Sequence, residues 1–189
     1  MKQLFHQAYR FLKASDAPLL LGCLGASLVS LFMLSGIVHS GLTEPRRFWV
    51  QLIALALGLI AAVVVSLFDY HFMARMWKIH VPVALLLVLL TFVIGAQRGG
   101  ADDKAWLILP FGMSFQPSEL LKVSFILSFA YHLSLVRETV SQPKTLALLC
   151  LPGAAPVPLI HLEGDDGTAL IFAAIFVGML FAAGLEWRY

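Results

Sequence analysis

The chain has 189 residues, of which 60% are apolar and only 13% are charged. Because soluble domains carry about 25% charged residues, this composition and a mean hydropathy of +0.87 exclude an ordinary soluble domain and indicate a bilayer protein. The net charge of +2 is small and the basic residues are scattered among apolar blocks, which excludes a nucleic-acid-binding surface.

The N-terminal segment, residues 1–16, carries apolar side chains at helical spacing among basic residues. These apolar residues are Leu4, Phe5, Ala8, Tyr9 and Leu12. The pattern favours an amphipathic cytoplasmic leader that lies on the membrane surface. A merely solvated basic leader is the alternative.

Apolar blocks of helical length follow, and each is a candidate to cross the roughly 30 Å hydrocarbon core of a bilayer. They cover residues 19–38, 49–68, 79–96, 117–135, 145–160 and 168–185. The fifth block contains Pro152, Pro156 and Pro158, and an interior proline removes a backbone donor and clashes with the preceding turn. The sequence therefore predicts an all-α polytopic integral membrane protein. We expect a single transmembrane helical domain over residues 1–189, with six helices of which the fifth is kinked or broken.

Lysine and arginine set the expected orientation. With the N-terminus in the cytoplasm, the inner side holds Lys2, Arg10, Lys13, Arg75, Lys78, Arg137, Lys144 and Arg188, and the outer side holds only Arg46, Arg47, Arg98 and Lys104. This excess predicts a cytoplasmic N-terminus. The outer face is then acidic, with Glu44, Asp102, Asp103, Glu163, Asp165 and Asp166.

Two opposite charges lie near the start of the fourth block, in the segment Gln116-Pro117-Ser118-Glu119-Leu120-Leu121-Lys122. A proline in the first turn, followed by a serine and an acidic residue, is typical of a helix start. Glu119 and Lys122 share one helical face, so each can neutralise the other. An ionisable residue inside a membrane span costs roughly 2.5–3.5 kcal/mol, so the presence of Lys122 in this block has to be explained. A buried structural ion pair, a substrate-cavity role and an ordinary interfacial pair all remain open.

A second polar cluster precedes the sixth block and consists of His161, Glu163, Asp165, Asp166, Gly167 and Thr168. Its carboxylates and imidazole are the side chains that a divalent cation could use. Alternatively, Asp165 or Asp166 caps the sixth helix, with Gly167 allowing a tight entry. One carboxylate suffices for a cap, so a substrate-facing role for the others stays open. We assign no metal ligand and no cofactor, and leave a divalent cation as a possibility.

The remaining polar positions suggest interfacial roles. The outer connection 97–116 carries Trp106 and further apolar residues, so we expect it to fold back onto the membrane surface with Trp106 as an anchor. His39, His71, His80 and His132 lie at or near predicted helix ends and are interpreted as interfacial rings. Ser27, Ser35 and Ser114 lack the flanking glycine pattern or the deep histidine partner that an intramembrane serine protease needs.

The two polar clusters resemble motifs of the bacterial shape, elongation, division and sporulation (SEDS) proteins, the RodA/FtsW/SpoVE family. Members typically carry FQPSEL followed by a lysine at the start of the fourth span, and this chain has Phe115–Leu120 and Lys122. Members carry QPDxGT at the start of the sixth span. Here the second motif is Glu163-Gly164-Asp165-Asp166-Gly167-Thr168, which keeps the aspartate and Gly-Thr and replaces Gln-Pro. The family has about ten spans, so the chain resembles its N-terminal part.

The resemblance implies a peptidoglycan glycosyltransferase that polymerises glycan strands from undecaprenyl-linked lipid II at the bacterial inner membrane, in elongation, division or sporulation. Implied partners are a class B penicillin-binding transpeptidase and other cell elongation or division membrane proteins. Residues carried over to the substrate cavity are Glu119, Lys122, Asp165, Gly167 and Thr168, and those carried over as a structural motif are Gln116, Pro117 and Ser118. The catalytic aspartate of the family lies beyond these motifs, so no catalytic residue is assigned. A lipid II flippase or a noncatalytic membrane scaffold is the alternative function.

Overall fold

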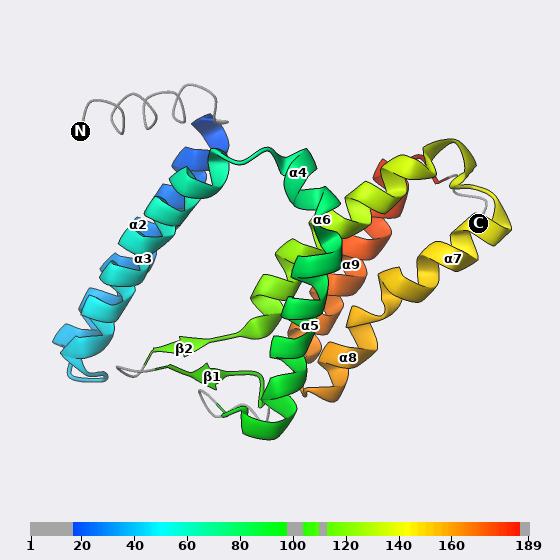
Figure 1. Ribbon diagram of the computed structural model, residues 1–189. Coiled ribbons are helices and arrows are strands. Elements are labelled where there is room, and N and C mark those ends of the chain that lie inside the picture. The colour runs from blue at the N-terminus through cyan, green and yellow to red at the C-terminus, as the bar shows by residue number, and fades with distance from the viewer. Residues whose placement is uncertain (1–16, 98–103, 110–112, 186–189) are drawn as a thin grey trace. The chain divides into compact units, whose positions relative to one another are not determined.

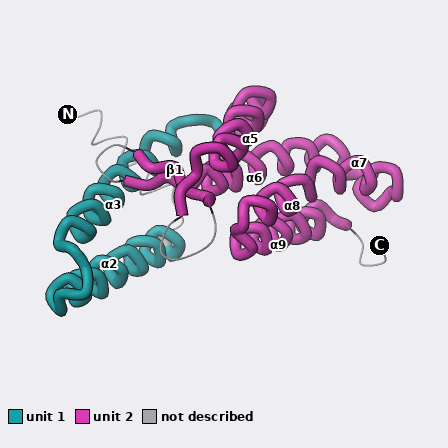
Figure 2. The backbone as a smooth tube through the Cα atoms, turned by 90° about the horizontal axis from the view of Figure 1, so that it is seen from below, with its two compact units in different colours: residues 1–69 teal, residues 70–189 magenta. Residues whose placement is uncertain are grey.

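The computed structural model describes residues 17–97, 104–109 and 113–185. The chain divides into two compact units, residues 1–69 and 70–189, which are described separately (Figure 2). Helices dominate both units (Figure 1), which confirms the predicted helical fold class. The expected leader helix lies outside the described residues.

Unit 1 contains two packed helices, α2 (Ala17–His39) and α3 (Pro45–Ser66). The helix α3 begins four residues before the predicted start at Trp49, since Pro45 suits the first turn of a helix and Arg46 and Arg47 are accommodated in that turn. The predicted start followed the apolar block, which begins only after the arginines. No described side chain of α3 is buried within the protein.

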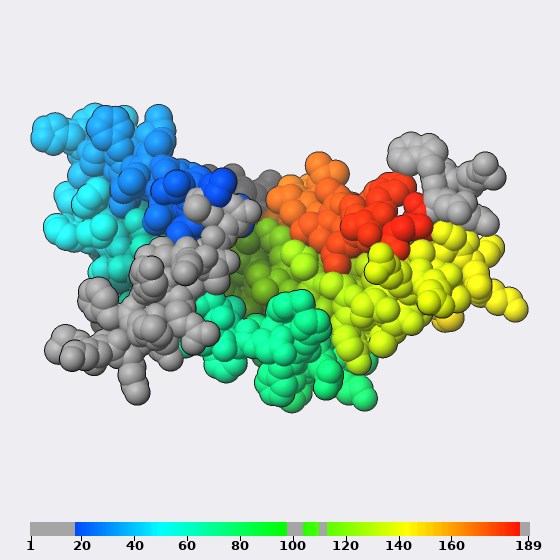
Figure 3. Space-filling view, turned by 90° about the horizontal axis from the view of Figure 1, so that it is seen from above, coloured from blue at the N-terminus to red at the C-terminus, as the bar shows by residue number. Residues whose placement is uncertain are grey.

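Unit 2 is a helical bundle arranged around α6 (Pro117–Leu135). The other helical elements are α4 (Tyr70–Arg75), α5 (Trp77–Ile94), η2 (Arg137–Thr139), α7 (Pro143–Ala154), α8 (Pro156–Leu162) and α9 (Asp166–Ala182). The central helix packs against α4, α5 and α9, while α7 and α8 pack against α9. Figure 3 looks onto the end of the bundle where α4, the end of α6, the start of α7 and the end of α9 gather.

The fifth predicted helix is broken, as its prolines indicate. One segment, α7, ends at Ala154, and the next, α8, begins at Pro156. Pro152 lies inside α7, whereas Pro156 lies in the first turn of α8, where a missing N–H costs nothing. The break divides this stretch into two helices, of which α8 ends at the second polar cluster.

The connection between α5 and α6 folds back as a short hairpin of β1 (Leu107–Ile108) and β2 (Ser114–Phe115), which the sequence did not predict. The strands are antiparallel, with Leu107 opposite Phe115. A bridge between Ala96 and Trp106 joins the hairpin to the end of α5. Strands this short carry no alternating pattern from which a sequence argument could find them. Trp106 is half-buried, and its role as a membrane anchor stays a prediction.

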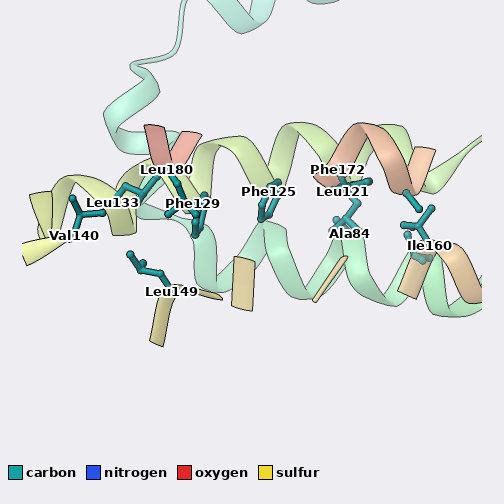
Figure 4. Close-up of a cluster of buried hydrophobic side chains, with 12 residues drawn as sticks. Ala84, Leu121, Phe125, Phe129, Leu133, Val140, Leu149, Ile160, Phe172 and Leu180 are labelled. Atoms are coloured by element: carbon teal, nitrogen blue, oxygen red, sulfur yellow. The ribbon is translucent and has the colours of Figure 1, made fainter. Parts of the chain in front are cut away.

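The core of unit 2 runs along α6 and is rich in phenylalanine. Figure 4 labels Phe125, Phe129 and Phe172 among its buried side chains. The Phe125 and Phe129 rings stack at 5.3 Å, and Phe176 meets Phe129 at 5.4 Å. These contacts join α6 to α9. On the other side, Gly153 of α7 approaches so closely that an added Cβ would lie 2.3 Å from the Phe176 ring.

Four described stretches are long and apolar enough to cross a membrane: Pro18–His39, Pro45–Ser66, Trp77–Ile94 and Pro143–Leu162. The chain is therefore a multi-pass membrane protein. A further apolar helix, Asp166–Ala182, is shorter. The total of six spans stays a prediction, as does the single domain over residues 1–189.

Candidate functional site

The two polar motifs meet where α6 and α9 begin. Gln116, the residue that precedes α6, donates from Nε2 to Asp165 Oδ2 at 2.6 Å. The other oxygen of the same carboxylate accepts the backbone N–H of Thr168 at 2.8 Å and so caps α9. Capping by Asp165 was one of the predicted alternatives, but the contact with Gln116 was not predicted. Asp165 therefore joins two motifs that are 49 residues apart in the chain.

The predicted pairing of Glu119 with Lys122 is confirmed. Lys122 Nζ lies 2.7 Å from Glu119 Oε1. The lysine side chain is only 15% exposed, whereas that of Glu119 is 56% exposed. The carboxylate thus faces outward and holds a largely buried ammonium group beside the start of α6. An ammonium has three donors, so one such bond leaves it able to meet an anion.

Ser118 and Pro117 are buried at the start of α6, next to Gln116. The Ser118 side chain is fully buried, and its hydroxyl has no hydrogen-bond partner in the part of the chain that the structure describes. Because the side chain is buried, Ser118 contributes to the close packing of the helix start, and its hydroxyl is not exposed to a substrate. The structural role carried over to Gln116, Pro117 and Ser118 remains a prediction.

The turn between α8 and α9 depends on Gly164, which corrects the expectation placed on Gly167. Gly164 has a φ of 93°, and the N–H groups of Gly164 and Asp165 bond to the His161 and Ile160 carbonyls. This is the Schellman pattern, in which a left-handed glycine ends a helix. Gly167 instead lies inside the first turn of α9, where an added Cβ would be 3.6 Å from Asp165 Oδ1. The motif position at which other members carry proline thus holds a conformation that proline cannot adopt.

Glu163 and Thr91 form a contact that sequence reasoning missed. The Glu163 residue is only 6% exposed and Thr91 is fully buried. The Thr91 hydroxyl hydrogen-bonds to Glu163 Oε1 and also lies 2.6 Å from the Val88 carbonyl oxygen. The contact ties the α8–α9 turn to the last turn of α5. The only feature of the sequence that could have indicated this contact is a polar residue, Thr91, within an apolar helix.

The described residues do not fit a metal site. No group of three or more His, Cys, Asp or Glu side chains among them could hold a metal ion. His161 Nδ1 pairs with Asp166 Oδ1 at 2.5 Å on the surface, Asp165 is engaged by Gln116, and Glu163 points to Thr91. The carboxylates of the second cluster therefore diverge, and we derive no chemical step through a cation.

His80 is a structural link between helices, which its interpretation as an interfacial ring did not predict. Its Nδ1 lies 2.6 Å from Ser124 Oγ and its Nε2 lies 3.1 Å from the Met73 carbonyl oxygen, so it joins α4, α5 and α6. A carbonyl only accepts, so Nε2 donates to Met73, and in the neutral imidazole the Ser124 hydroxyl then donates to Nδ1. Because Ser124 is only 4% exposed, its hydroxyl is not available to a substrate as a nucleophile.

A cavity of about 590 Å³ lies between α5, α6 and the α7–α8 segments, and apolar side chains dominate its lining. Trp77, Phe125, His132, Leu149 and Pro152 are among the residues that line it. Neither the Gln116–Asp165 contact nor the Glu119–Lys122 pair contributes to it. The polar site at the starts of α6 and α9 is therefore separate from this cavity.

Comparison with known proteins places the chain in a family. The family model FTSW_RODA_SPOVE, described as "Cell cycle protein", matches residues 16–189. The chain belongs to the FtsW/RodA/SpoVE family. This membership confirms the resemblance carried by the two motifs, which the structure brings together as the Gln116–Asp165 contact.

Curated members of the FtsW/RodA/SpoVE family are similar to most of this chain. A protein named probable peptidoglycan glycosyltransferase FtsW from Thiomicrospira cyclica is 36% identical over 141 residues, which cover 74% of this chain and 35% of the relative. The peptidoglycan glycosyltransferase RodA of Treponema pallidum is 28% identical over 92% of this chain and 40% of its own length. The chain thus spans less than half the length of these two relatives.

Solved structures of the family share the fold. A chain from a structure titled "Structural coordination of polymerization and crosslinking by a peptidoglycan synthase complex" matches with a TM-score of 0.76 and 27% identity, over 93% of this chain and 49% of the other. The rod shape determining protein RodA of Thermus thermophilus matches with a TM-score of 0.66 and 28% identity, over 93% of this chain and 56% of that one. These matches support the helical membrane fold.

Proposed function

We propose that this chain forms part of a SEDS-type peptidoglycan glycosyltransferase that polymerises glycan strands from lipid II at the outer face of the bacterial inner membrane. Family membership and the names of the curated relatives support this activity. The single structural observation that carries the proposal is the Gln116–Asp165 hydrogen bond, which assembles both family motifs into one polar site.

The site has the chemistry to receive the anionic head of a lipid-linked pyrophosphate. The N-termini of α6 and α9 converge, and helix N-termini carry partial positive charge that favours phosphate groups. Lys122 adds a full positive charge, and Glu119 holds it in place. Both oxygens of Asp165 accept hydrogen bonds, from Gln116 and from the Thr168 N–H, and these bonds stabilise its negative charge. The apolar helix surfaces around the site suit a polyprenyl tail.

Roles follow from this geometry. Lys122 contacts the pyrophosphate, Glu119 orients Lys122, and Asp165 with Gly167 and Thr168 forms one wall of the polar site at the start of α9. Gln116, Pro117 and Ser118 build the start of α6 and connect it to that wall. No described residue is assigned as the catalytic group.

A class B penicillin-binding transpeptidase is the proposed partner, together with other membrane proteins of cell elongation or division. The support is the similarity to a chain solved within a peptidoglycan synthase complex in which polymerisation and crosslinking are coordinated. Polymerisation is therefore to be measured with the transpeptidase present.

The test uses the full-length protein that contains this chain, purified with its transpeptidase and given labelled lipid II. We expect the double variant Glu119→Ala, Asp165→Ala to lower the rate of glycan polymerisation by about 10-fold or more, because misplacing a substrate by about 1 Å is enough to cost that much. Glu138→Ala is the matched control, since Glu138 is an exposed carboxylate of η2 outside the site. Undiminished polymer from the double variant would remove these two residues from the mechanism.

A lipid II flippase is the second candidate, and the broken α7–α8 helix favours it. Discontinuous helices beside polar sites are typical of transporters, where freed backbone groups line the substrate path. The same purified protein separates the two activities when it is reconstituted in vesicles. Transfer of labelled lipid II between leaflets without polymer would support the flippase, whereas polymer from lipid II already on the outer side supports the glycosyltransferase.

A further inference from the structure

Glu163 is a carboxylate buried beside the proposed site without belonging to it. The residue caps the end of α8, is only 6% exposed and hydrogen-bonds to Thr91, which is 72 residues away in the chain. Burying an ionisable side chain costs free energy unless it is well hydrogen-bonded. The buried position of Glu163 therefore suggests a structural or functional role.

Thr91 provides a rigid anchor for Glu163. It lies in the last turn of α5 and is fully buried, and its carbonyl accepts the N–H of Gly95 at 2.7 Å. An added Cβ at Gly95 would lie 1.9 Å from the Lys104 carbonyl oxygen, so the chain leaving α5 is packed closely against the backbone that leads into β1. The hydroxyl of Thr91 therefore has a fixed position from which to hold its partner.

Glu163 lies two positions before the aspartate that joins the two motifs. Only Gly164 separates Glu163 from Asp165, and Gly164 takes the left-handed conformation that turns the chain from α8 into α9. A displacement of Glu163 is therefore passed through one residue to Asp165. From there it reaches the 2.6 Å contact with Gln116.

We propose that Glu163 is a positioning residue, which acts through its hydrogen bond with Thr91 to hold Asp165 against Gln116. The proposal rests on the proposed function, because the position of Asp165 matters for activity only if the α6–α9 site receives the substrate. It assigns to Glu163 and Thr91 a role that neither polar motif predicts.

The hydrogen bond between positions 163 and 91 can be kept without a net charge at position 163. The Thr91 hydroxyl has one proton but lies near two acceptors, Glu163 Oε1 and the Val88 carbonyl oxygen. A glutamine at position 163 has the same length, and its amide can donate to the Thr91 oxygen while the hydroxyl donates to Val88. Glu163→Gln therefore retains the tie, whereas Glu163→Met keeps the length and removes it.

The experiment uses the full-length protein with its transpeptidase and measures kcat and KM for labelled lipid II, together with the thermal midpoint of unfolding. We expect Glu163→Gln and Thr91→Ser to stay within about 2-fold of the parent in kcat/KM. Glu163→Met and the isosteric Thr91→Val should each lower kcat/KM by about 10-fold, which corresponds to the loss of one hydrogen bond near the upper end of the usual range. The two changes together should cost no more than either alone, since they remove the same contact.

A cycle with Asp165→Ala separates positioning from general stability. If Glu163 acts through Asp165, Glu163→Met causes no further loss of kcat/KM in the Asp165→Ala protein. A full further loss in that background overturns the proposal, as does a Glu163→Met protein with parental kinetics. A Glu163→Gln protein as impaired as Glu163→Met would show that charge matters and would also overturn it.

The thermal midpoint keeps this inference distinct from the proposed function. It requires no activity, and the coupling between Glu163→Met and Asp165→Ala in the midpoint reports whether the two residues act as a unit. If the parent protein makes no polymer, the proposed function fails, while additive midpoint shifts would overturn the positioning role by themselves. If the midpoint shifts are coupled in a protein that makes no polymer, Glu163 still positions Asp165, and only the connection of that role to polymerisation is lost.

Discussion

Gly164 and Gly167 occupy the same short motif, yet only Gly164 has a backbone that a side chain would strain. At φ 93° a Cβ crowds the backbone, at a cost of roughly 1–2 kcal/mol. We therefore expect Gly164→Ala to lower the free energy of unfolding by about that amount. Gly164→Pro should cost more, because the ring fixes φ near −65° and removes the N–H that bonds to the His161 carbonyl. Unfolding of the purified protein in detergent, followed by circular dichroism, measures both effects.

Gly167→Ala is the control for the Gly164 variants. Gly167 lies in the first turn of α9, and an added Cβ meets Asp165 Oδ1 at an ordinary 3.6 Å. Alanine is favoured over glycine in a helix by about 1 kcal/mol, so this variant should be as stable as the parent or slightly more so. A loss equal to that of Gly164→Ala would contradict the placement of the turn.

Local chemistry at single residues was predictable, and distant partners were not. The sequence allowed Asp165 as a cap and paired Glu119 with Lys122, because both arguments need only the spacing along one helix. The partners of Asp165, Glu163 and His80 lie 49, 72 and 44 residues away. Spacing carries no information about such pairs, since they depend on how the helices pack.

Among the elements, boundaries were predictable where a residue with a backbone constraint marks them. Helix α6 spans Pro117–Leu135, as predicted, because a proline and an acidic residue open it where the apolar block begins. At α3 the proline and the apolar block do not coincide, and the block alone placed the start too late. The hairpin between α5 and α6 escaped prediction because it is held by backbone bonds that no side-chain pattern reveals.

Packing of α7 against α6 and α9 depends on Gly153. An added Cβ there would lie 2.3 Å from Phe176 and 2.9 Å from Phe129, so the rings must shift. We expect Gly153→Ala to lower the free energy of unfolding by about 1–3 kcal/mol, the usual cost of overpacking a core. The midpoint of thermal unfolding in detergent measures the loss, and truncating the ring in Gly153→Ala, Phe176→Leu should restore part of it.

Gly178→Ala provides the matched comparison for Gly153→Ala. Both glycines lie inside helices, but an added Cβ at Gly178 meets nothing within 4 Å. Helix propensity alone then makes Gly178→Ala neutral or stabilising. Equal destabilisation by the two variants would show that the close approach of Gly153 to the phenylalanines does not govern its effect.

At the scale of the whole molecule, hydropathy identified membrane helices but not which of them bury side chains in protein. The most apolar 18 residues of α3 have a mean hydropathy of 2.6 and those of α5 have 2.2. None of this α3 stretch is buried within the protein, whereas 17% of the α5 stretch is. Lipid and protein neighbours are equally apolar, so both environments select the same side chains. The phenylalanine core of residues 70–189 was therefore not predictable from composition, although each of its helices was.

This difference predicts that the same substitution has unequal effects in the two units. Leu121 of α6 is 2% exposed within the core, whereas Leu57 of α3 is 56% exposed. Leu121→Ala leaves a cavity among close-packed side chains and should lower the free energy of unfolding by about 2–5 kcal/mol. Leu57→Ala shortens an apolar side chain that is already mostly exposed, so its effect should stay below about 0.5 kcal/mol. Thermal unfolding of both variants in one detergent decides the matter, because equal shifts of the midpoint would mean that α3 packs against protein as tightly as α6 does.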